Sequence, residues 1–434
     1  MSTDVDPYVP GHGDLSYDVV HYDLDLAYDV PGNRLDGTAT ISGVAREVIS
    51  ELRLDLHALD VTKVALDHKP VKYRDRKDTL TVRPATPIPV GESFTLTVRY
   101  AGRPTPIASR TLGSSGWEEL EDGVIVAGQP HGAPSWFPCN DRPSNKATYR
   151  ISLAVPTDYR VIANGRLTSS RRRSSSVVWV HEQDQPMATY LATVHVGRYE
   201  LRTDEGDVDV HTALPRRLQA MYDDTFGDQR AMLDTFVRLF GPYPFEAYTV
   251  VVTDDDLEIP LEAQGLAAFG ANILTGEWSS IRLVAHELSH QWFGNSLTLD
   301  RWQDIWLHEG FACYAEWIWS EESGGRTAQD HAEEHHARLS GLGQDLLLAD
   351  PGPELMFDDR VYKRGALLLH ALRLTVGDDA FFGLVRAWTA KHAHGTVNSA
   401  GFMEFADLTT GRELVDLFDR WLYRAALPEL PPAP

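Results

Sequence analysis

Residues 279–295 read SSIRLVAHELSHQWFGN, and this stretch carries the pattern that decides the fold and the chemistry of the second half of the chain. Serines at its start and Gly-Asn at its end are typical of helix caps, so we expect one complete helix. His286 and His290 are four residues apart, so both imidazoles leave one helix face and can bind the same metal ion. Glu287 is the next residue round the helix and is placed to act as a general base on a water at the metal.

A second stretch is expected to supply the third ligand. A zinc ion in a catalytic site takes three protein ligands and keeps one position open. Glu309 lies nineteen residues after His290, in the sequence WLHEGFA of residues 306–312, which we expect to form another helix. Two imidazoles and one carboxylate favour zinc, one ion per chain. The alternative, a buried polar helix face, requires the HExxH pattern and the spaced glutamate to coincide by chance.

Asp304 is a candidate for orienting one of these ligands. It lies five residues before Glu309, and a carboxylate often accepts a hydrogen bond from the second ring nitrogen of a ligand histidine. A solvated aspartate near a helix start explains the residue equally well.

The first two hundred residues have the pattern of β-strands. In residues 22–30, Tyr, Leu, Leu, Tyr and Val alternate with polar or small residues, which is the period of a half-buried strand. The same alternation recurs at 52–56, 94–100 and 149–155, with turn residues such as Asn164-Gly165 between the runs. Several short strands of this kind predict a curved sheet or a sandwich.

The pattern changes after about residue 205. Apolar residues recur at helical spacing over 228–240, and Gly241-Pro242 closes that run. A strand-like stretch follows at 248–252, and helical patterns dominate from there to the end. We therefore predict an α+β protein with an N-terminal β domain over residues 1–203 and a mostly helical catalytic domain over residues 204–434.

Composition excludes several classes of function. With 43% hydrophobic and 24% charged residues, the chain of 434 residues has the composition of a globular protein. Its net charge of −23 argues against a nucleic-acid partner, because phosphate binding needs clustered cations. The basic run Arg171-Arg172-Arg173 leads into three serines, which predicts a solvated hairpin turn rather than a binding patch. No stretch approaches the ~18 apolar residues of a membrane span.

Two features favour a cytoplasmic location. The first seven residues are acidic and polar and lack the basic and apolar regions of a signal peptide. The two cysteines, Cys139 and Cys313, lie far apart in sequence and form no disulfide framework, which fits a reducing compartment.

These segments together resemble the aminopeptidase N family of gluzincin zinc peptidases, whose motif is HExxH, eighteen residues, then Glu. The sequences HELSHQWFGN at 286–295 and WLHEGFA at 306–312 look like the family's metal-binding segments, with His308 where the family usually has Asn. The sequence WFPCND at 136–141, followed by KAT at 146–148, is similar to the family's entry segment into the catalytic cleft. The resemblance extends from about residue 15 to 425 and implies a thermolysin-like catalytic domain.

The resemblance also implies roles for three further residues. Tyr362 stands where the family keeps a catalytic tyrosine that hydrogen-bonds the developing oxyanion; a helix-surface tyrosine is the alternative. Glu262 falls on the family's Gly-x-Met-Glu-Asn segment, whose glutamate binds the free α-ammonium of the substrate. Leu261 and Ala263 replace Met and Asn there, so an ordinary loop carboxylate stays open as an alternative. Gln129 would line the same amine site from the β domain.

The chain also departs from the family in length, in addition to the changes at Leu261 and Ala263. Its members usually continue into a small β-sandwich and a large helical domain that covers the active site, whereas this chain ends about where the next domain would begin. We expect a two-domain form with an open cleft, or a second copy or a partner chain that supplies the lid. A monomeric mass together with full activity would rule out the dimeric lid.

Four functions are consistent with this pattern. The first is a zinc aminopeptidase that removes N-terminal residues from peptides. The second is a zinc endopeptidase, or a peptidase that processes a precursor such as a leader peptide, and it is favoured by the altered amine segment. A non-catalytic peptide-binding scaffold is disfavoured because ligands, base and tyrosine are all present. Hydrolysis of a non-peptide substrate such as an epoxide would use the same zinc chemistry. The preferred N-terminal residue is not predicted, because loops form that pocket.

Overall fold

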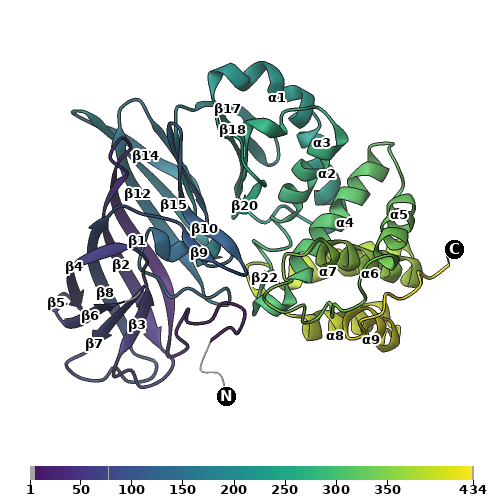
Figure 1. The fold of residues 1–434 in the computed structure, drawn as a ribbon, viewed down its shortest axis with the longest axis horizontal. Helices are drawn as coiled ribbons and strands as arrows, with labels where there is room; N and C mark the ends of the chain where they lie inside the picture. Colours follow the sequence, from purple (N-terminus) through teal and green to yellow (C-terminus); the bar gives the residue numbers. More distant parts are fainter. Residues whose placement is uncertain (1–4, 77, 433–434) are drawn as a thin grey trace. The chain divides into compact units, whose positions relative to one another are not determined.

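Strands fill the first part of the chain and helices the second, as the two patterns predict. The computed structural model describes residues 5–76 and 78–432. Strands follow one another from Tyr17 to Leu214, and α-helices dominate from Gln219 onward (Figure 1). The predicted fold class, a β domain followed by a mostly helical domain, is confirmed.

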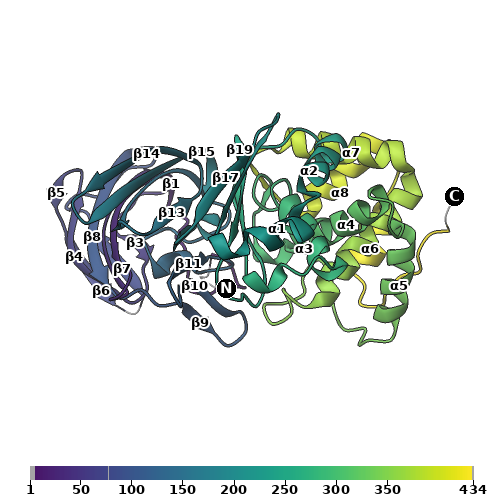
Figure 2. The same ribbon diagram turned by 90° about the horizontal axis from the view of Figure 1, so that it is seen from above.

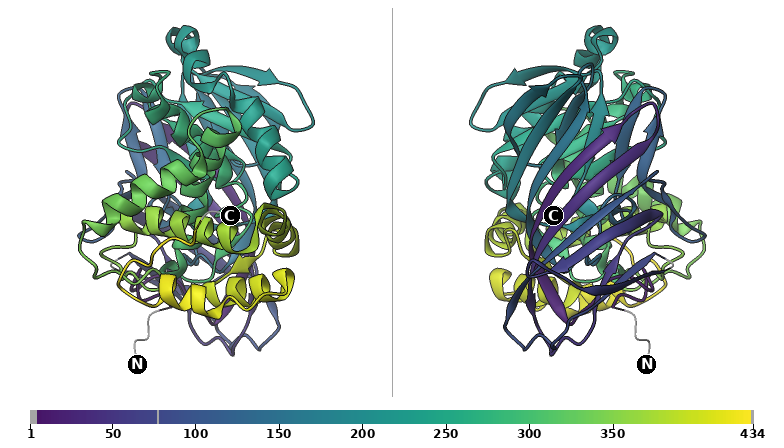
Figure 3. Two further views of the ribbon diagram at one scale, coloured as in Figure 1. Left: turned by 90° about the vertical axis from the view of Figure 1, so that its right-hand side faces the viewer. Right: turned by 90° about the vertical axis from the view of Figure 1, so that its left-hand side faces the viewer.

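An eight-stranded sheet is the largest layer of the first part. Its strands twist strongly and the sheet curves (Figures 2 and 3). Neighbouring strands are antiparallel except for the parallel pair β1 and β12. In β1, Tyr22, Leu24 and Leu26 are buried while the aspartates between them reach solvent, so the predicted alternation is confirmed. The strands in sheet order are β14 (Arg166–Arg173), β15 (Ser176–Ala188), β12 (Lys146–Pro156), β1 (Tyr17–Asp29), β2 (Arg34–Ala45), β8 (Ser93–Gly102), β4 (Leu59–Leu66) and β5 (Lys69–Pro70).

Two smaller sheets accompany it. One has the order β13 (Arg160–Ala163), β16 (Val194–Gly197), β11 (Gly123–Ala127), β10 (Gly113–Leu120) and β9 (Ile107–Ser109). The other has the order β3 (Leu52–Asp55), β7 (Thr79–Arg83) and β6 (Lys72–Arg76).

The basic run is exposed, as predicted, but it does not form the turn itself. Arg171, Arg172 and Arg173 are the last three residues of β14. The turn follows at Ser174, whose φ of 48° is left-handed.

A further sheet carries Glu262. Its order is β17 (Glu200–Asp204), β18 (Asp209–Leu214), β19 (Ala247–Val252), β21 (Leu266–Phe269) and β20 (Leu261–Ala263). Strands β18, β19 and β21 run parallel, and the edge strand β20 pairs antiparallel with β21. Glu262 is the middle residue of β20.

Packing divides the chain into two units that are not continuous in sequence. Residues up to Arg217 and residues Phe245–Ala271 form the first, and Leu218–Pro244 with Asn272–Pro434 form the second. The sheet that contains β17 to β21 therefore packs with the first unit. The predicted domain boundary between residues 203 and 204 falls within β17 and stays a prediction.

The second unit is a bundle of helices (Figure 3). A two-stranded ladder of β22 (Thr298–Leu299) and β23 (Thr396–Val397) accompanies them. Short 3₁₀ turns occur in both units, at Ala133–Ser135, Thr189–Leu191, Arg216–Leu218, Ala271–Ile273 and Trp302–Asp304. The helices are α1 (Gln219–Phe226), α2 (Gln229–Phe240), α3 (Trp278–Ser289), α4 (Trp306–Glu322), α5 (Ala328–Ser340), α6 (Asp359–Val376), α7 (Asp378–Lys391), α8 (Ser399–Thr410) and α9 (Val415–Leu422).

Helix α4 is the central element of this bundle and crosses α6 at very short range. It is buried from Trp306 to Ser320. Where the two helices meet, a Cβ added to Gly310 would lie 2.8 Å from the Cα of Gly365, and a Cβ on Gly365 would lie 2.7 Å from the Cα of Gly310. Only glycine allows two backbones to approach in this way. The crossing places the residue before Gly310 and the first turn of α6 close together.

Across residues 5–76 and 78–432, helices long and apolar enough to span a bilayer are absent. Cys139 lies in the first unit and Cys313 in the second, and both thiols are buried and free.

Candidate metal centre

Helix α3 carries both histidines but is shorter than predicted. It begins at Trp278, after an N-cap at Glu277, so the serines predicted as caps lie inside its first turn. It ends at Ser289, and His290 is the C-cap residue. The expectation of one helix over 279–295 is therefore wrong at both ends.

The chain after α3 winds more widely than an α-helix. The amides of Asn295, Ser296 and Leu297 donate to carbonyls five residues earlier, at 3.0 to 3.1 Å. Gly294 has a φ of +130°, which side chains disfavour, and a Cβ there would lie 3.3 Å from Nδ1 of His290. The missing side chain at Gly294 therefore leaves room for the imidazole of His290.

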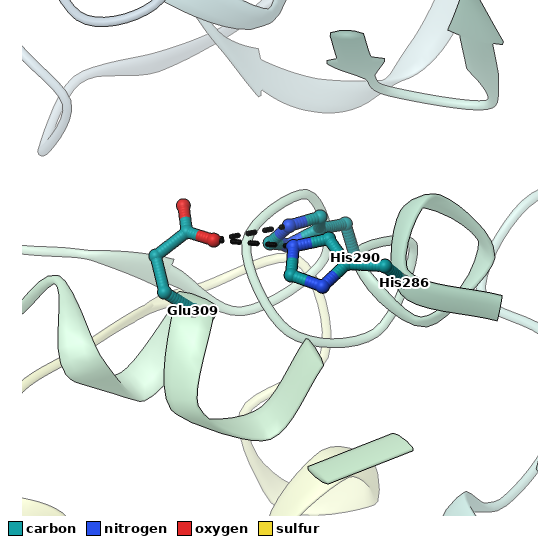
Figure 4. Close-up of side chains that lie close together, drawn as sticks. All are labelled: His286, His290 and Glu309. Atoms are coloured by element: carbon teal, nitrogen blue, oxygen red, sulfur yellow. Dashed lines mark hydrogen bonds and ion pairs between the residues drawn. The ribbon is translucent and has the colours of Figure 1, made fainter. Parts of the chain in front are cut away.

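The three predicted ligands converge on one point (Figure 4). Nε2 of His286 lies 3.3 Å from Oε2 of Glu309, and Nε2 of His290 lies 3.5 Å from the same oxygen. One donor atom from each of the three side chains falls within 4.8 Å of the other two. All three residues are buried, with exposed fractions of 7%, 1% and 2%.

The other ring nitrogen of each histidine, Nδ1, forms a hydrogen bond within the protein. Nδ1 of His286 lies 2.8 Å from Oε1 of Glu316, and Nδ1 of His290 lies 2.9 Å from the carbonyl oxygen of Phe293. A carboxylate or a carbonyl can only accept, so each Nδ1 carries the proton and each Nε2 lone pair faces the common point.

The carboxylate that orients His286 is Glu316. The prediction that Asp304 has this role is wrong. Asp304 instead accepts hydrogen bonds from the backbone amide and hydroxyl of Ser399, at 3.1 Å from the amide. Glu316 lies seven residues after Glu309 in α4, which is two helical turns, so both carboxylates leave the same helix face. This spacing is the sequence signal that could have identified it.

Two cations hold Glu316 in its ionised form. Nη1 of Arg282, from α3, lies 3.1 Å from Oε2 of Glu316. Burial alone would raise the pKa of Glu316, but the charge of Lys363, the hydrogen bond to His286 and Arg282 lower it to about 2. Lys363, from α6, itself contacts Sγ of Cys313 at 3.1 Å. Helices α3, α4 and α6 thus meet in a charged network behind the histidines.

Glu287 has the environment of a base rather than of a ligand. It is 4% exposed, and its Oε2 has no hydrogen-bond partner among the described residues. Burial raises the pKa of its carboxyl, against the opposing charges of His286 and His290. A raised pKa brings a carboxylate closer to the range in which it exchanges protons at neutral pH.

The residues present fit a zinc ion. Burial would raise the pKa of Glu309, but the two histidines hold it well below its usual value, so the carboxylate is ionised. Burial lowers the pKa of His286, but hydrogen bonds to Glu309 and Glu316 raise it to about 9, so a metal that binds Nε2 must displace a proton there. Two imidazole nitrogens and one carboxylate oxygen are a common donor set of catalytic zinc, with one position left for a water or a substrate.

Tyr362 lies beside this cluster. It is in the first turn of α6, and its ring is nearly parallel to that of His286, with 6.1 Å between centroids and 20° between planes. It is half-buried. The structure therefore brings the predicted tyrosine to the predicted ligands.

The two predicted amine-binding residues belong to the first unit, whereas the ligands, Glu287 and Tyr362 belong to the second. Glu262 is half-buried on β20 and pairs with Ala267 of β21. Gln129 is half-buried just after β11, and its Nε2 has no hydrogen-bond partner among the described residues. Their role in binding an amine stays a prediction.

Two histidines one helical turn apart, joined by a glutamate from the following helix, are the donor set of the gluzincin metallopeptidases. The chain belongs to peptidase family M1: residues 226–421 match the peptidase family M1 domain, and residues 19–191 match the peptidase M1 N-terminal domain. The predicted family is thereby confirmed.

Individual relatives agree with this assignment. The crystal structure of an M1 zinc metallopeptidase from Deinococcus radiodurans superposes with a TM-score of 0.91 at 32% identity, over 99% of this chain and 100% of that one. The leucyl aminopeptidase of Saccharolobus solfataricus is 24% identical over 86% of this chain and 50% of its own length. Aminopeptidase M1 of Arabidopsis thaliana is 25% identical over 71% of this chain and 38% of its own length. The chain thus spans half or less of the length of these two curated relatives.

Proposed function

We propose that this protein is a zinc-dependent aminopeptidase that removes N-terminal residues from peptides. The observation that carries the proposal is the convergence of His286, His290 and Glu309 beside the buried carboxylate of Glu287. The relatives named leucyl aminopeptidase and aminopeptidase M1 support the same reaction class.

Zinc is the metal that the three ligands would hold. When bound there, it polarises the scissile carbonyl and lowers the pKa of water, which generates a nucleophile at neutral pH. Glu316 and the carbonyl of Phe293 keep both ligand imidazoles in the orientation that this requires.

Glu287 and Tyr362 carry the proton transfer and the charge stabilisation. Glu287 takes the proton of the attacking water and returns it to the leaving nitrogen, so one carboxylate serves both halves of the reaction. The phenol of Tyr362 donates a hydrogen bond to the oxygen that becomes negative in the transition state. One donor of this kind is typically worth about 2.7–4 kcal/mol.

Glu262 and Gln129 would restrict cleavage to the bond after the N-terminal residue. A carboxylate that binds the α-ammonium fixes the distance from the peptide end to the scissile bond, and the amide of Gln129 would supply a further hydrogen bond. A mutant of the Deinococcus radiodurans enzyme has been solved with a Tyr-Ser-Ala substrate, which is a short peptide of the class proposed here.

A cytoplasmic location is part of this proposal. Both cysteines are free thiols buried in separate units, which is the usual state of cysteines in a reducing compartment.

Endopeptidase or precursor-processing activity is the second candidate. Leu261 and Ala263 flank Glu262 where the family has Met and Asn, and this departure weakens the case for a fixed amine anchor.

A panel of aminoacyl chromogenic amides, measured beside the same peptides with acetylated N-termini, separates the two candidates. We expect turnover of free amides only, with a KM at least tenfold higher for Glu262→Gln. Equal cleavage of acetylated peptides would replace the aminopeptidase proposal with the endopeptidase one.

A further inference from the structure

His290 depends on a backbone group for its orientation. Its Nδ1 donates to the carbonyl oxygen of Phe293 at 2.9 Å, whereas Nδ1 of His286 is held by the carboxylate of Glu316. A carboxylate side chain can follow a small movement of the ring, but a backbone carbonyl points where the chain around it points. The direction of Nε2 of His290, which faces Glu309 in Figure 4, is therefore set by whatever fixes the peptide group after Phe293.

Hydrogen bonds hold that peptide group from two sides. The amide of Phe293 donates to the carbonyl of Ser289 at 3.1 Å, which fixes the nitrogen side of the Phe293 Cα. The amide of Gly294 donates to the carbonyl of Leu297 at 3.0 Å, which limits rotation of the planar peptide group that contains the Phe293 carbonyl. Because a Cα is tetrahedral, the direction of its bond to the carbonyl carbon is fixed only when its Cβ is fixed as well. The side chain of Phe293 supplies this last constraint.

The ring of Phe293 is packed face to face against the ring of Phe311. The centroids are 4.1 Å apart and the planes are inclined by 12°, which is closer than the ~4.5–7 Å of most aromatic pairs. The ring of Phe240, the last residue of α2, meets Phe293 at 74° with 5.2 Å between centroids. Phe293 and Phe311 are 1% and 3% exposed, so water does not compete for these contacts. The two neighbouring rings thus hold the Cβ of Phe293.

Phe311 belongs to the helix that carries the third ligand. It lies two residues after Glu309 in α4, and its ring also packs against Phe402 of α8, with 5.7 Å between centroids and 88° between planes. Each ring of the stack therefore belongs to a segment that holds a metal ligand, since Phe293 follows His290 and Phe311 follows Glu309. The stack joins these two segments through side chains that carry no metal-binding atoms.

We propose that the stacked pair of Phe293 and Phe311 positions His290 for the metal. The stack fixes the Cβ of Phe293, the Cα then directs the carbonyl at Nδ1 of His290, and the imidazole keeps Nε2 towards the zinc position. Phe311 acts through Phe293 and is a positioning residue rather than a ligand. This role belongs to the zinc centre and is independent of which peptide bond the enzyme cleaves.

The first test is the zinc affinity of Phe311→Leu, measured on the full chain by competition with a chromophoric chelator. Leucine keeps an apolar side chain but removes the ring, so the carbonyl of Phe293 gains freedom and His290 must be oriented when the metal binds. We expect the zinc dissociation constant to rise about tenfold, the lower end of the range for partners that orient metal ligands. Wild-type affinity in Phe311→Leu would overturn the proposal.

Phe226→Leu is the matched control. Phe226 is also a buried phenylalanine of the second unit, 3% exposed, and its ring stacks on Tyr222 of α1 at 4.6 Å and 8°. Loss of this stack should lower stability in thermal unfolding and leave the zinc affinity unchanged. An equal rise of the dissociation constant in both variants would show a general effect of a lost ring and contradict the role of Phe311. Glu404→Gln, at an exposed position on α8, gives the scatter between preparations.

The second test separates His290 from His286 within one molecule. In zinc-loaded protein with isotope-labelled histidine, NMR observes the Nδ1 protons of both ligands, and Glu316→Gln assigns the signal of His286. Phe311→Leu should speed the solvent exchange of the His290 proton several-fold and leave the His286 proton at its wild-type rate, because Glu316 holds that ring independently. Equal acceleration of both protons, or of neither, would contradict the proposal. If Phe311→Leu does not fold, Phe311→Met, whose flexible side chain fills space without a flat ring, takes its place in both tests.

Discussion

Glu316 orients a ligand histidine although it is not one of the three converging donor residues. It fixes the ring of His286 through Nδ1, and Arg282 fixes its other oxygen. A ligand imidazole that is free to turn binds a metal less tightly, because its orientation must be fixed on binding.

Replacing this carboxylate should weaken zinc binding without unfolding the protein. Glu316→Gln keeps the size and one acceptor but loses the charge that pairs with Arg282. We expect the zinc dissociation constant to rise about 10- to 100-fold, measured by competition with a chromophoric chelator. Glu404→Gln is the control and should bind zinc like the wild type. Unchanged affinity in Glu316→Gln would remove Glu316 from the account.

At the scale of elements, the crossing of α4 and α6 fixes the distance between Glu309 and Tyr362. Because Gly310 and Gly365 touch through their backbones, any side chain at either position must separate the helices. Overpacking of this kind typically costs 1–3 kcal/mol.

Gly365→Ala should therefore lower the free energy of unfolding by about 1–3 kcal/mol and reduce turnover at the same time. Gly383→Ala in α7 is the matched control, because a Cβ there meets nothing within 4 Å. Alanine in place of glycine in an open helix position gains about 0.5–1 kcal/mol. Chemical denaturation of both variants measures the difference, and the same sign of effect in both would contradict the close crossing.

The strands of the first unit bury a histidine whose titration affects stability. His195, in β16, is 1% exposed, and burial lowers its pKa from 6.5 to about 3. The folded state thus favours the neutral ring. Its contribution to stability is present above pH 6.5 and is lost as the pH falls towards 3, because the unfolded chain binds the proton first.

His195→Gln removes this proton uptake and keeps an amide within reach of Thr193, whose hydroxyl lies 3.1 Å from Nε2. Between pH 6.5 and 4.5, the wild type should lose stability relative to the variant by up to about 1.4 kcal/mol per pH unit. Urea unfolding at several pH values measures the difference in unfolding free energy. A difference that stays constant with pH would show that folding does not lower the pKa of His195.

At the scale of the whole molecule, the sequence predicted what is local and missed what depends on packing. His286 and His290 share a helix face through a spacing of four residues, and β1 buries Tyr22 and Leu24 through a period of two. Both patterns can be recognised from the sequence alone, because each depends only on residue spacing. The carboxylate that orients His286 comes from another helix. Whether Asp304 or Glu316 reaches the imidazole depends on how α3 packs against α4, which the sequence does not show.

Two other differences have the same origin. Helix α3 ends at Ser289, before the Gly-Asn pair at 294–295 that the sequence suggested as its cap, and the positive φ of Gly294 belongs to the wider turn that follows the helix. The sheet of β17 to β21 packs with the first unit although helices α1 and α2 separate its strands in sequence. Strand pairing across such an insertion is not encoded in any single stretch.

The central claim is that Glu287 is the base of a zinc site held by His286, His290 and Glu309. The most direct test is turnover of a free aminoacyl amide by wild type and Glu287→Gln, each loaded with zinc and assayed for metal content in the same sample. We predict one zinc ion per chain in both proteins and a turnover at least 10²-fold lower in the variant, the usual contribution of a general base. Wild-type turnover in a zinc-loaded Glu287→Gln enzyme would contradict the account.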